Sequence, residues 1–575
     1  MYNMIKMRYL ATLVATLGAG IPQFAAAQTD VSLPSNQASL EELQDALKRS
    51  RDRSQTSEPQ GNQLLLLRGI RIADAGQERV ETPTTGVDLE QVSGLDDPDT
   101  AVILNAYIGR PLSKELLAEI LQRTNEALAA SGRGFTVAYL PEQDVSDGSV
   151  LIEVQQARVG QIGVQVQGDG LPPEEYIRLL RIEPGDVLTK DQIDEETEWL
   201  NKSNPYRNAV VIAQPGEQVG STDVNLLVSN RRPYAFSAGY DNGGTRTTGY
   251  DRISFTAGMG NLFGTDQQLN YSLSASPNFN NLVSHGLGYV IPLPWRHLLS
   301  VNANYSEFKG RVPAPLESEG ESSGLNLRYD IFLPRVGSYT HGMYFSFDHK
   351  RSDNNLLFSN TPVTNNLTEI YQFVAGYSFA LPDEFGSTRL GVNWFHSPGG
   401  GSGAASDAAF NASRFGARSD YDYQTITLER LTELPQDWTW NLLLRVQEAS
   451  GNLLGSEQLV GGGVTAVRGL KDPLAYGDSG HVLRSELNAP LQSMDSIVLP
   501  VRLQPYVFYD QARLNKEVLL PGEAGLNELS SWGVGVRASL DKNVSLSLEA
   551  AKLLVVNVPG LQADNTIHVR LSYSF

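Results

Sequence analysis

The segment "VRLQPYVFYD", residues 501–510, alternates strictly between two kinds of position. Successive side chains of a β-strand point to opposite faces. One face would carry Val501, Leu503, Pro505, Val507 and Tyr509. The other would carry Arg502, Gln504, Tyr506, Phe508 and Asp510. This pattern predicts a strand with one apolar face and one largely polar face.

The same alternation continues to the end of the chain. It recurs in "SWGVGVRASL" (531–540), "NVSLSLEA" (543–550) and "TIHVRLSYSF" (566–575). Strands of about 10 residues with one apolar face are typical of membrane β-barrels. A soluble β-sandwich would show the same alternation, so the connections between strands must distinguish the two.

The connections alternate between short and long. Sixteen candidate strands fit between residues 233 and 575, at about 21 residues per strand with its connection. Short connections include "LPRVGS", "LPQD" and "DKN", whereas residues 306–322, 351–366 and 397–420 are expected to form long ones. Short turns on one side and long loops on the other favour a barrel. Because a sheet in lipid must close to satisfy its backbone, we predict a membrane β-barrel of about sixteen antiparallel strands over residues 232–575.

Composition excludes several classes of function. The 575 residues include no cysteine, which excludes disulfides, thiolate zinc sites and thiol catalysis. The seven histidines lack metal-ligand spacing, so neither a metal nor a cofactor is expected. The formal net charge of −20 argues against nucleic acid as a partner. No apolar run reaches the roughly 20 residues of a membrane helix.

The N-terminus has the pattern of a secretory signal. A basic start, a short apolar stretch and Ala25-Ala26-Ala27 predict a signal peptide over residues 1–27. Residues 28–61 are expected to hold a short helix and a linker. Ser39 and Glu42 form a capping box for that helix, which is either docked or a solvated linker helix.

Two small α+β units are predicted before the barrel, over residues 62–157 and 158–231. Each combines strand-like runs with an amphipathic helical segment, of which "SKELLAEILQRTNEALAASG" is the clearer. Such units expose strand edges, to which an extended guest chain can pair.

A glycine-rich connection, residues 449–480, joins the predicted strands 11 and 12 and contains Arg468. Strand parity directs Asp510 of strand 13 and Glu486 of strand 12 into the lumen. An arginine–carboxylate pair in a confined site can be bidentate and strong. We therefore predict that Arg468 anchors this loop inside the barrel; the alternative is a surface arginine on a disordered loop.

These features resemble the two-partner secretion transporters (TpsB family), the group of the filamentous haemagglutinin exporters and haemolysin activators. The resemblance covers the mature chain. The family's VRGY loop motif corresponds to Val467, Arg468, Gly469 and Leu470. "VFYDQA" is similar to the barrel motif whose aspartate, here Asp510, pairs with that arginine. Leu470 replaces the usual aromatic residue and Ala512 the usual glycine.

The resemblance implies two POTRA domains, an N-terminal helix that plugs the lumen, and the outer membrane of a Gram-negative bacterium. It implies no enzymatic activity. The POTRA domains would bind a large secreted exoprotein (TpsA type, an adhesin or haemolysin), which the barrel exports to the cell surface. Tyr573 and Phe575 would form a signal for the barrel-assembly machinery, and the chain would be a monomer in the bilayer.

Other functions remain as alternatives. A barrel-assembly insertase of the same superfamily usually carries more periplasmic repeats, and a passive porin lacks both those repeats and an inward VRG loop. "GDSG" at 477–480 resembles a serine-protease motif. A protease would require a histidine base and a buried carboxylate arranged in one soluble core, whereas this segment leads directly into a predicted barrel strand.

Overall fold

The computed structural model describes residues 65–75, 85–89, 92, 95, 98–131, 135–216, 221–359, 361–471, 475–495, 500–558 and 565–575. The predicted signal peptide (1–27) and helical segment (28–61) lie outside the described residues. The described chain forms two compact units that meet in sequence between Arg231 and Arg232. Its described helices are all too short or too polar to cross a bilayer.

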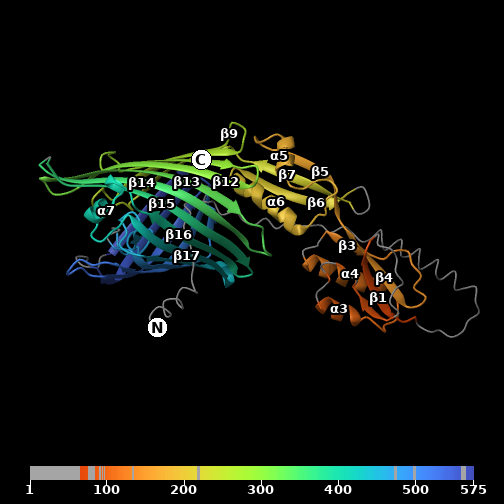
Figure 1. Ribbon diagram of the computed structural model, residues 1–575. Helices are drawn as coiled ribbons and strands as arrows, with labels where there is room; N and C mark the ends of the chain where they lie inside the picture. The colour runs from red at the N-terminus through yellow and green to blue at the C-terminus, as the bar shows by residue number, and fades with distance from the viewer. Residues whose placement is uncertain are drawn as a thin grey trace, which may run out of the picture. The chain divides into compact units, whose positions relative to one another are not determined.

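The first α+β domain is built on a four-stranded sheet in the order β2-β1-β4-β3. Figure 1 shows this domain in red to orange. Its elements are β1 (Gly69–Asp74), β2 (Gly86–Asp88), α3 (Pro98–Asn105), α4 (Lys114–Ala130), β3 (Thr136–Tyr139) and β4 (Ser149–Gln156). The hydroxyl of Ser113 caps α4 by accepting from the Leu116 amide. The predicted apolar stripe of α4 packs with β1 and β4 in one core. The sequence did not reveal α3 or β2.

The second α+β domain has a three-stranded sheet in the order β5-β7-β6. It contains β5 (Arg158–Gln167), α5 (Pro173–Leu179), α6 (Lys190–Ser203), β6 (Arg207–Pro215) and β7 (Ser221–Asn230). β5 pairs parallel with β7, and β6 pairs antiparallel with it. The core of this domain is separate and includes Tyr176, Leu200 and Leu226.

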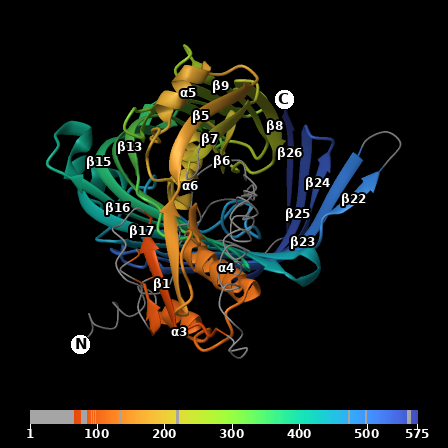
Figure 2. The same cartoon turned by 90° about the vertical axis from the view of Figure 1, so that its right-hand side faces the viewer.

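Most of the remaining strands close into a barrel of sixteen antiparallel strands, which confirms the prediction (Figure 2). They are β8 (Tyr234–Asp241), β9 (Arg252–Leu262), β10 (Gln267–Ala275), β11 (Leu282–Pro292), β12 (His297–Gly310), β13 (Leu316–Phe332), β14 (Thr340–Phe358), β15 (Thr361–Asp383), β16 (Gly386–Pro398), β17 (Asp420–Leu434), β18 (Trp438–Ala449), β21 (Ser479–Asn488), β22 (Gln492–Asp495), β23 (Pro500–Asn515), β24 (Leu526–Leu540), β25 (Val544–Asn557) and β26 (Asn565–Ser574). β21 and β22 both pair with β23 and count as the twelfth strand. Pro490, which has no N–H, lies in the break between them.

Two of the three connections expected to be long loops are strands. β14 and β15 contain 19 and 23 residues, and they pair with each other from Thr340 to Phe358. The prediction of loops at 306–322 and 351–366 was therefore wrong. Strands that project beyond the bilayer have water on both faces, so their sequence need not alternate. Residues 399–419 do form a long connection, which holds η1 (Gly403–Ala405) and α7 (Asp407–Ser413).

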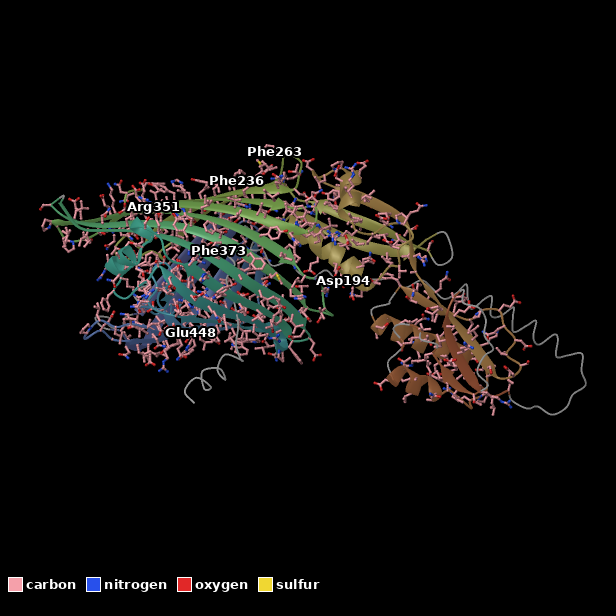
Figure 3. All side chains as sticks on the ribbon, in the orientation of Figure 1. Asp194, Phe236, Phe263, Arg351, Phe373 and Glu448 are labelled. Carbon is pink, nitrogen blue, oxygen red and sulfur yellow. The ribbon has the colours of Figure 1, made fainter. Side chains whose placement is uncertain are left out.

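The outer face of the barrel carries large apolar side chains. Phe236 and Phe373, for example, are 42% and 53% exposed (Figure 3). Along the middle of β9–β12 the opposite face carries small polar residues and glycines that are paired across the strands, while Arg252, Val290 and Phe308 lie on the same face nearer the strand ends. The inward small polar and glycine positions are Ser254, Thr256, Gly258, Asn270, Ser272, Ser274, Ser284, Gly286, Gly288, Asn302, Asn304 and Ser306. We refer to them as the neutral wall.

The barrel closes where the last strand meets the first. β26 pairs with β8 over Arg570–Ser574 and Ser237–Asp241. Phe575 extends this pairing, since its amide donates to the Phe236 carbonyl at 2.9 Å and its carbonyl accepts from the Phe236 amide at 3.1 Å. The C-terminal residue thus contributes main-chain hydrogen bonds to the closure.

Candidate functional site in the barrel lumen

The connection between β18 and β21 spans residues 450–478, and its described residues, 450–471 and 475–478, pack against the inner faces of neighbouring strands. We call it the lumen loop; it contains the short strands β19 (Leu459–Val460) and β20 (Tyr476–Gly477). Val467 and Leu470 are buried in a cluster with Leu514, Leu529 and Leu553 of β23–β25. Leu470 therefore packs among aliphatic side chains.

Arg468 lies at the centre of this contact with its side chain fully buried. Its Nη2 is 2.7 Å from Asp510 Oδ1, and its Nε donates to Asp510 Oδ2 at 2.8 Å. This is the bidentate geometry in which a guanidinium binds a carboxylate most strongly. Nη1 lies 2.6 Å from Glu486 Oε1 and 3.1 Å from Glu549 Oε1.

An aromatic ring completes the surroundings of the guanidinium. Its central carbon lies 3.5 Å from the centroid of the Phe508 ring, which allows a cation–π interaction. Burial alone would lower the pKa of Arg468, but the carboxylates of Asp510, Glu486 and Glu549 hold it above its ordinary value. The guanidinium therefore remains charged.

The site contains equal numbers of positively and negatively charged side chains. Arg484 lies 3.7 Å from both Asp510 Oδ1 and Glu486 Oε1. Arg537 donates to Glu486 Oε2 at 2.7 Å. Three arginines thus face three carboxylates, an arrangement that offsets the desolvation cost of each charge.

Hydrogen bonds also fix the main chain of Arg468 and Gly469. The Arg468 amide donates to Asp510 Oδ2, and the Gly469 amide donates to Ser531 Oγ, both at 3.1 Å. The carbonyls of Arg468 and Gly469 lie 2.8 Å from His568 Nε2 and 3.0 Å from Thr566 Oγ1. The contacts therefore extend over β21, β23, β24, β25 and β26.

Gly469 is required at its position by close packing. A Cβ atom there would lie 2.6 Å from Ser531 Cβ and 3.1 Å from the Cα of Leu553. Neither neighbour can withdraw without moving a barrel strand. Any larger residue would therefore push the lumen loop away from the wall.

The other residues singled out in the sequence do not contact Arg468. Tyr573 and Phe575 are half exposed or more at the strand closure, apart from the Arg468 site. In "GDSG", Asp478 is fully buried and accepts hydrogen bonds from Arg414 and the Leu453 amide, while Ser479 Oγ donates to Glu517. This segment joins the lumen loop to β21.

Sequence reasoning missed some members of the site. Phe508 and Asp510 lie on the same predicted face of one strand, and Glu549 lies on the inward face of another. Parity thus indicated the direction of these side chains, and the pairing of Arg468 with Asp510 was predicted. Nothing in the sequence indicated that Phe508 and Glu549 also contact Arg468. Within the described residues, no group of three or more His, Asp or Glu side chains could hold a metal ion.

Comparison with known proteins identifies the family. Residues 220–538, more than half of the chain, match the family described as "Haemolysin secretion/activation protein ShlB/FhaC/HecB". The chain belongs to this family. Residues 82–156 match the ShlB-type POTRA domain, so the first α+β domain is a POTRA domain.

Members of the ShlB/FhaC/HecB family with similar sequences are transporters. The chain is 23% identical to the heme/hemopexin transporter protein HuxB of Haemophilus influenzae over 470 residues, which cover 80% of this chain and 81% of that protein. It is 23% identical to the hemolysin transporter protein ShlB of Serratia marcescens over 407 residues, which cover 68% and 69%.

The fold agrees with solved structures. The structure of CdiB from Escherichia coli matches with a TM-score of 0.69 at 20% identity and covers 95% of this chain and 100% of that one. CdiB from Acinetobacter baumannii matches with a TM-score of 0.62 at 17% identity, covering 95% and 100%. The chain is thus a two-partner secretion transporter of the Gram-negative outer membrane, from a family of transporters rather than enzymes.

Proposed function

We propose that the protein exports one large partner exoprotein, of the adhesin or haemolysin type, from the periplasm to the cell surface. The observation that carries this proposal is the lumen loop, which is fixed inside a closed barrel by buried ionic contacts. The names of HuxB and ShlB describe transporters of heme/hemopexin and hemolysin, which supports an exported cargo. We further propose that the chain acts as a monomer and is inserted by the barrel-assembly machinery.

We propose that the mature protein has four parts: a helical plug and linker (28–61), POTRA domains over 62–157 and 158–231, and the barrel (232–575), after a signal peptide (1–27). The second α+β domain resembles the first in combining helices with a small sheet. In this proposal both domains receive the unfolded partner before it enters the barrel.

The edge of the second domain supports this step. Both the amide and the carbonyl of Ala209 on β6 bond to the Asn201 side chain, so they point away from β7. In an antiparallel strand, every second residue shares that direction. The amides and carbonyls of Val211 and Ala213 therefore point to an edge that no described strand pairs with, where an extended segment can add as a further strand.

We predict that Val211→Pro reduces export about tenfold, because it removes an edge N–H that a guest strand would use while sparing the ladder to β7. Val211→Ala, which keeps the N–H, is the matched control. Partner in the medium is measured together with the amount of transporter in the membrane. Normal export by Val211→Pro at an unchanged transporter level would show that this edge is not used.

The predicted plug has its own test. We expect deletion of residues 28–55 to raise single-channel conductance in planar bilayers while export continues, because a helix that occupies the lumen blocks ions. Equal conductance of the two proteins would indicate a peripheral helix.

One genetic experiment separates the three candidate functions. The partner to be tested is a very large secreted protein encoded by a gene next to that of the transporter, if the genome contains one. Deletion of the transporter should abolish secretion of that partner and leave other outer-membrane barrels folded. A general defect in barrel folding would favour the insertase, and unchanged secretion with lower permeability to small solutes would favour the porin.

A further inference from the structure

Besides Arg468 and Asp478, the lumen loop contains a third buried charge, eleven residues before Arg468 in the sequence. Glu457 is 4% exposed. Its Oε1 and Oε2 accept hydrogen bonds from Lys350 Nζ on β14 at 2.8 and 3.0 Å. Oε2 also accepts from the Tyr423 hydroxyl on β17 at 2.8 Å and from Gln372 Nε2 on β15 at 3.3 Å. One carboxylate thus joins the loop to three strands.

The main chain beside Glu457 is also held. Gln447 Nε2 of β18 donates to the carbonyl of Glu457 at 3.0 Å and to that of Asp478 at 2.9 Å. Leu453 and Leu454 are buried in a cluster with Phe410 of α7 and Tyr423. Burial would raise the pKa of Glu457, but Lys350 and Tyr423 hold it below its ordinary value, so the carboxylate is charged.

Glu457 and Arg468 bind different parts of the barrel. Glu457 contacts β14, β15 and β17, the seventh, eighth and tenth strands. The Arg468 motif contacts strands from β21 to β26, the twelfth to the sixteenth. The lumen loop is therefore fixed on two separate sectors of the wall, and strands seven to sixteen lie under or beside it.

We propose that Glu457 and Lys350 form a second, independent anchor that positions the first limb of the lumen loop, residues 450–460, and so limits the resting pore. These are positioning residues, and Arg468 holds the second limb, residues 461–471. This inference rests on the proposed function at one point only, which is the link between the position of the lumen loop and export. The position of the loop is measurable without any exported partner, so failure of this proposal is distinguishable from failure of the export proposal.

Hydrogen exchange of the purified, membrane-embedded protein tests the two limbs separately. In Glu457→Gln the amide group presents its own N–H donors to Lys350 or to Tyr423, and in Lys350→Met the buried carboxylate loses its counter-ion. Each should speed amide exchange in residues 453–459 roughly tenfold or more, since an unpaired buried charge or donor destabilises its surroundings by at least that factor. Neither of these variants should change amide exchange in residues 465–470. Arg468→Ala should accelerate amide exchange in residues 465–470 and leave exchange in residues 453–459 unchanged.

Two control variants accompany these. Lys350→Arg keeps the charge and should preserve slow exchange. Arg351→Met breaks the exposed Arg351–Glu369 pair between β14 and β15 and should leave both limbs unchanged. Heat-modifiable migration of every variant shows that the barrel has folded.

Ion conductance of the same proteins gives a second readout. We expect Glu457→Gln and Lys350→Met to conduct at least about twice as much as the parent, because the released limb no longer occupies the lumen. Faster amide exchange in both limbs of every variant would overturn the proposal, since the lumen loop would then open as a single unit. Unchanged exchange at 453–459 in folded Glu457→Gln and Lys350→Met would overturn it as well.

Discussion

Arg468→Ala is expected to reduce partner secretion at least about tenfold while the barrel still assembles. The substitution removes the cation that the carboxylates of Asp510, Glu486 and Glu549 surround. Breaking a fully buried ion pair costs roughly 3–5 kcal/mol, and water in the lumen reduces that figure. Even one third of this free energy would change the equilibrium between the bound and the released loop by about a factor of ten.

Asp510→Ala should have a similar effect, and the double variant should be no worse than either single one. Contacting partners give non-additive effects. Secretion is measured for all four genotypes and divided by the amount of folded transporter. If the two single defects multiply, Arg468 and Asp510 act independently and the anchor hypothesis is wrong.

Arg513→Ala provides the matched control for the arginine. Arg513 lies on the same strand as Asp510 and forms a pair at 3.4 Å with Glu528, but its side chain is 54% exposed. Exposed ion pairs contribute about 0–1 kcal/mol. We therefore expect secretion by Arg513→Ala to match that of the parent.

Deletion of Phe575 is expected to lower the amount of folded transporter in the outer membrane several-fold. Two changes contribute. The deletion removes the reciprocal main-chain hydrogen bonds with Phe236 that extend the closure between β26 and β8, and it removes the terminal aromatic ring. Heat-modifiable, surface-exposed protein is quantified in whole cells.

Phe575→Ala separates the two contributions, because it keeps the main chain and removes the ring. A loss equal to that of the deletion would assign the effect to the ring as an assembly signal, with Tyr573 unable to replace it. A loss in the deletion alone would assign it to closure of the barrel. An unchanged level of folded protein in the deletion strain would refute both explanations.

The sequence indicated the barrel because lipid imposes a strict rule on it. One face of each spanning strand must be apolar, and alternation in segments such as 501–510 and 566–575 follows directly. The same parity placed Asp510 and Glu486 on the inward face. Because the lumen loop joins strands eleven and twelve, parity also brought Arg468 within reach of both.

This rule does not apply to strand ends that water surrounds, so the sequence there does not distinguish strands from loops. The polar ends of β14 and β15 pair as strands without alternation, so they were expected to be loops. The short helices α3 and α5 have only 8 and 7 residues, too few for a clear periodicity. Glu457 was missed because Lys350 lies 107 residues away in sequence, and no local pattern predicts such a contact.

The neutral wall has a further consequence for a polypeptide in transit. The lumen loop is bound to strands seven to sixteen, and the Ser, Thr, Asn and Gly positions of the neutral wall lie on β9–β12, the second to fifth strands. Hydroxyls and amides both donate and accept hydrogen bonds, so they can interact with any sequence, and water can replace each interaction at little net cost. A chain sliding along such a surface would have a short residence time at every point, which would allow one passage to serve a cargo of varied composition without retaining any part of it.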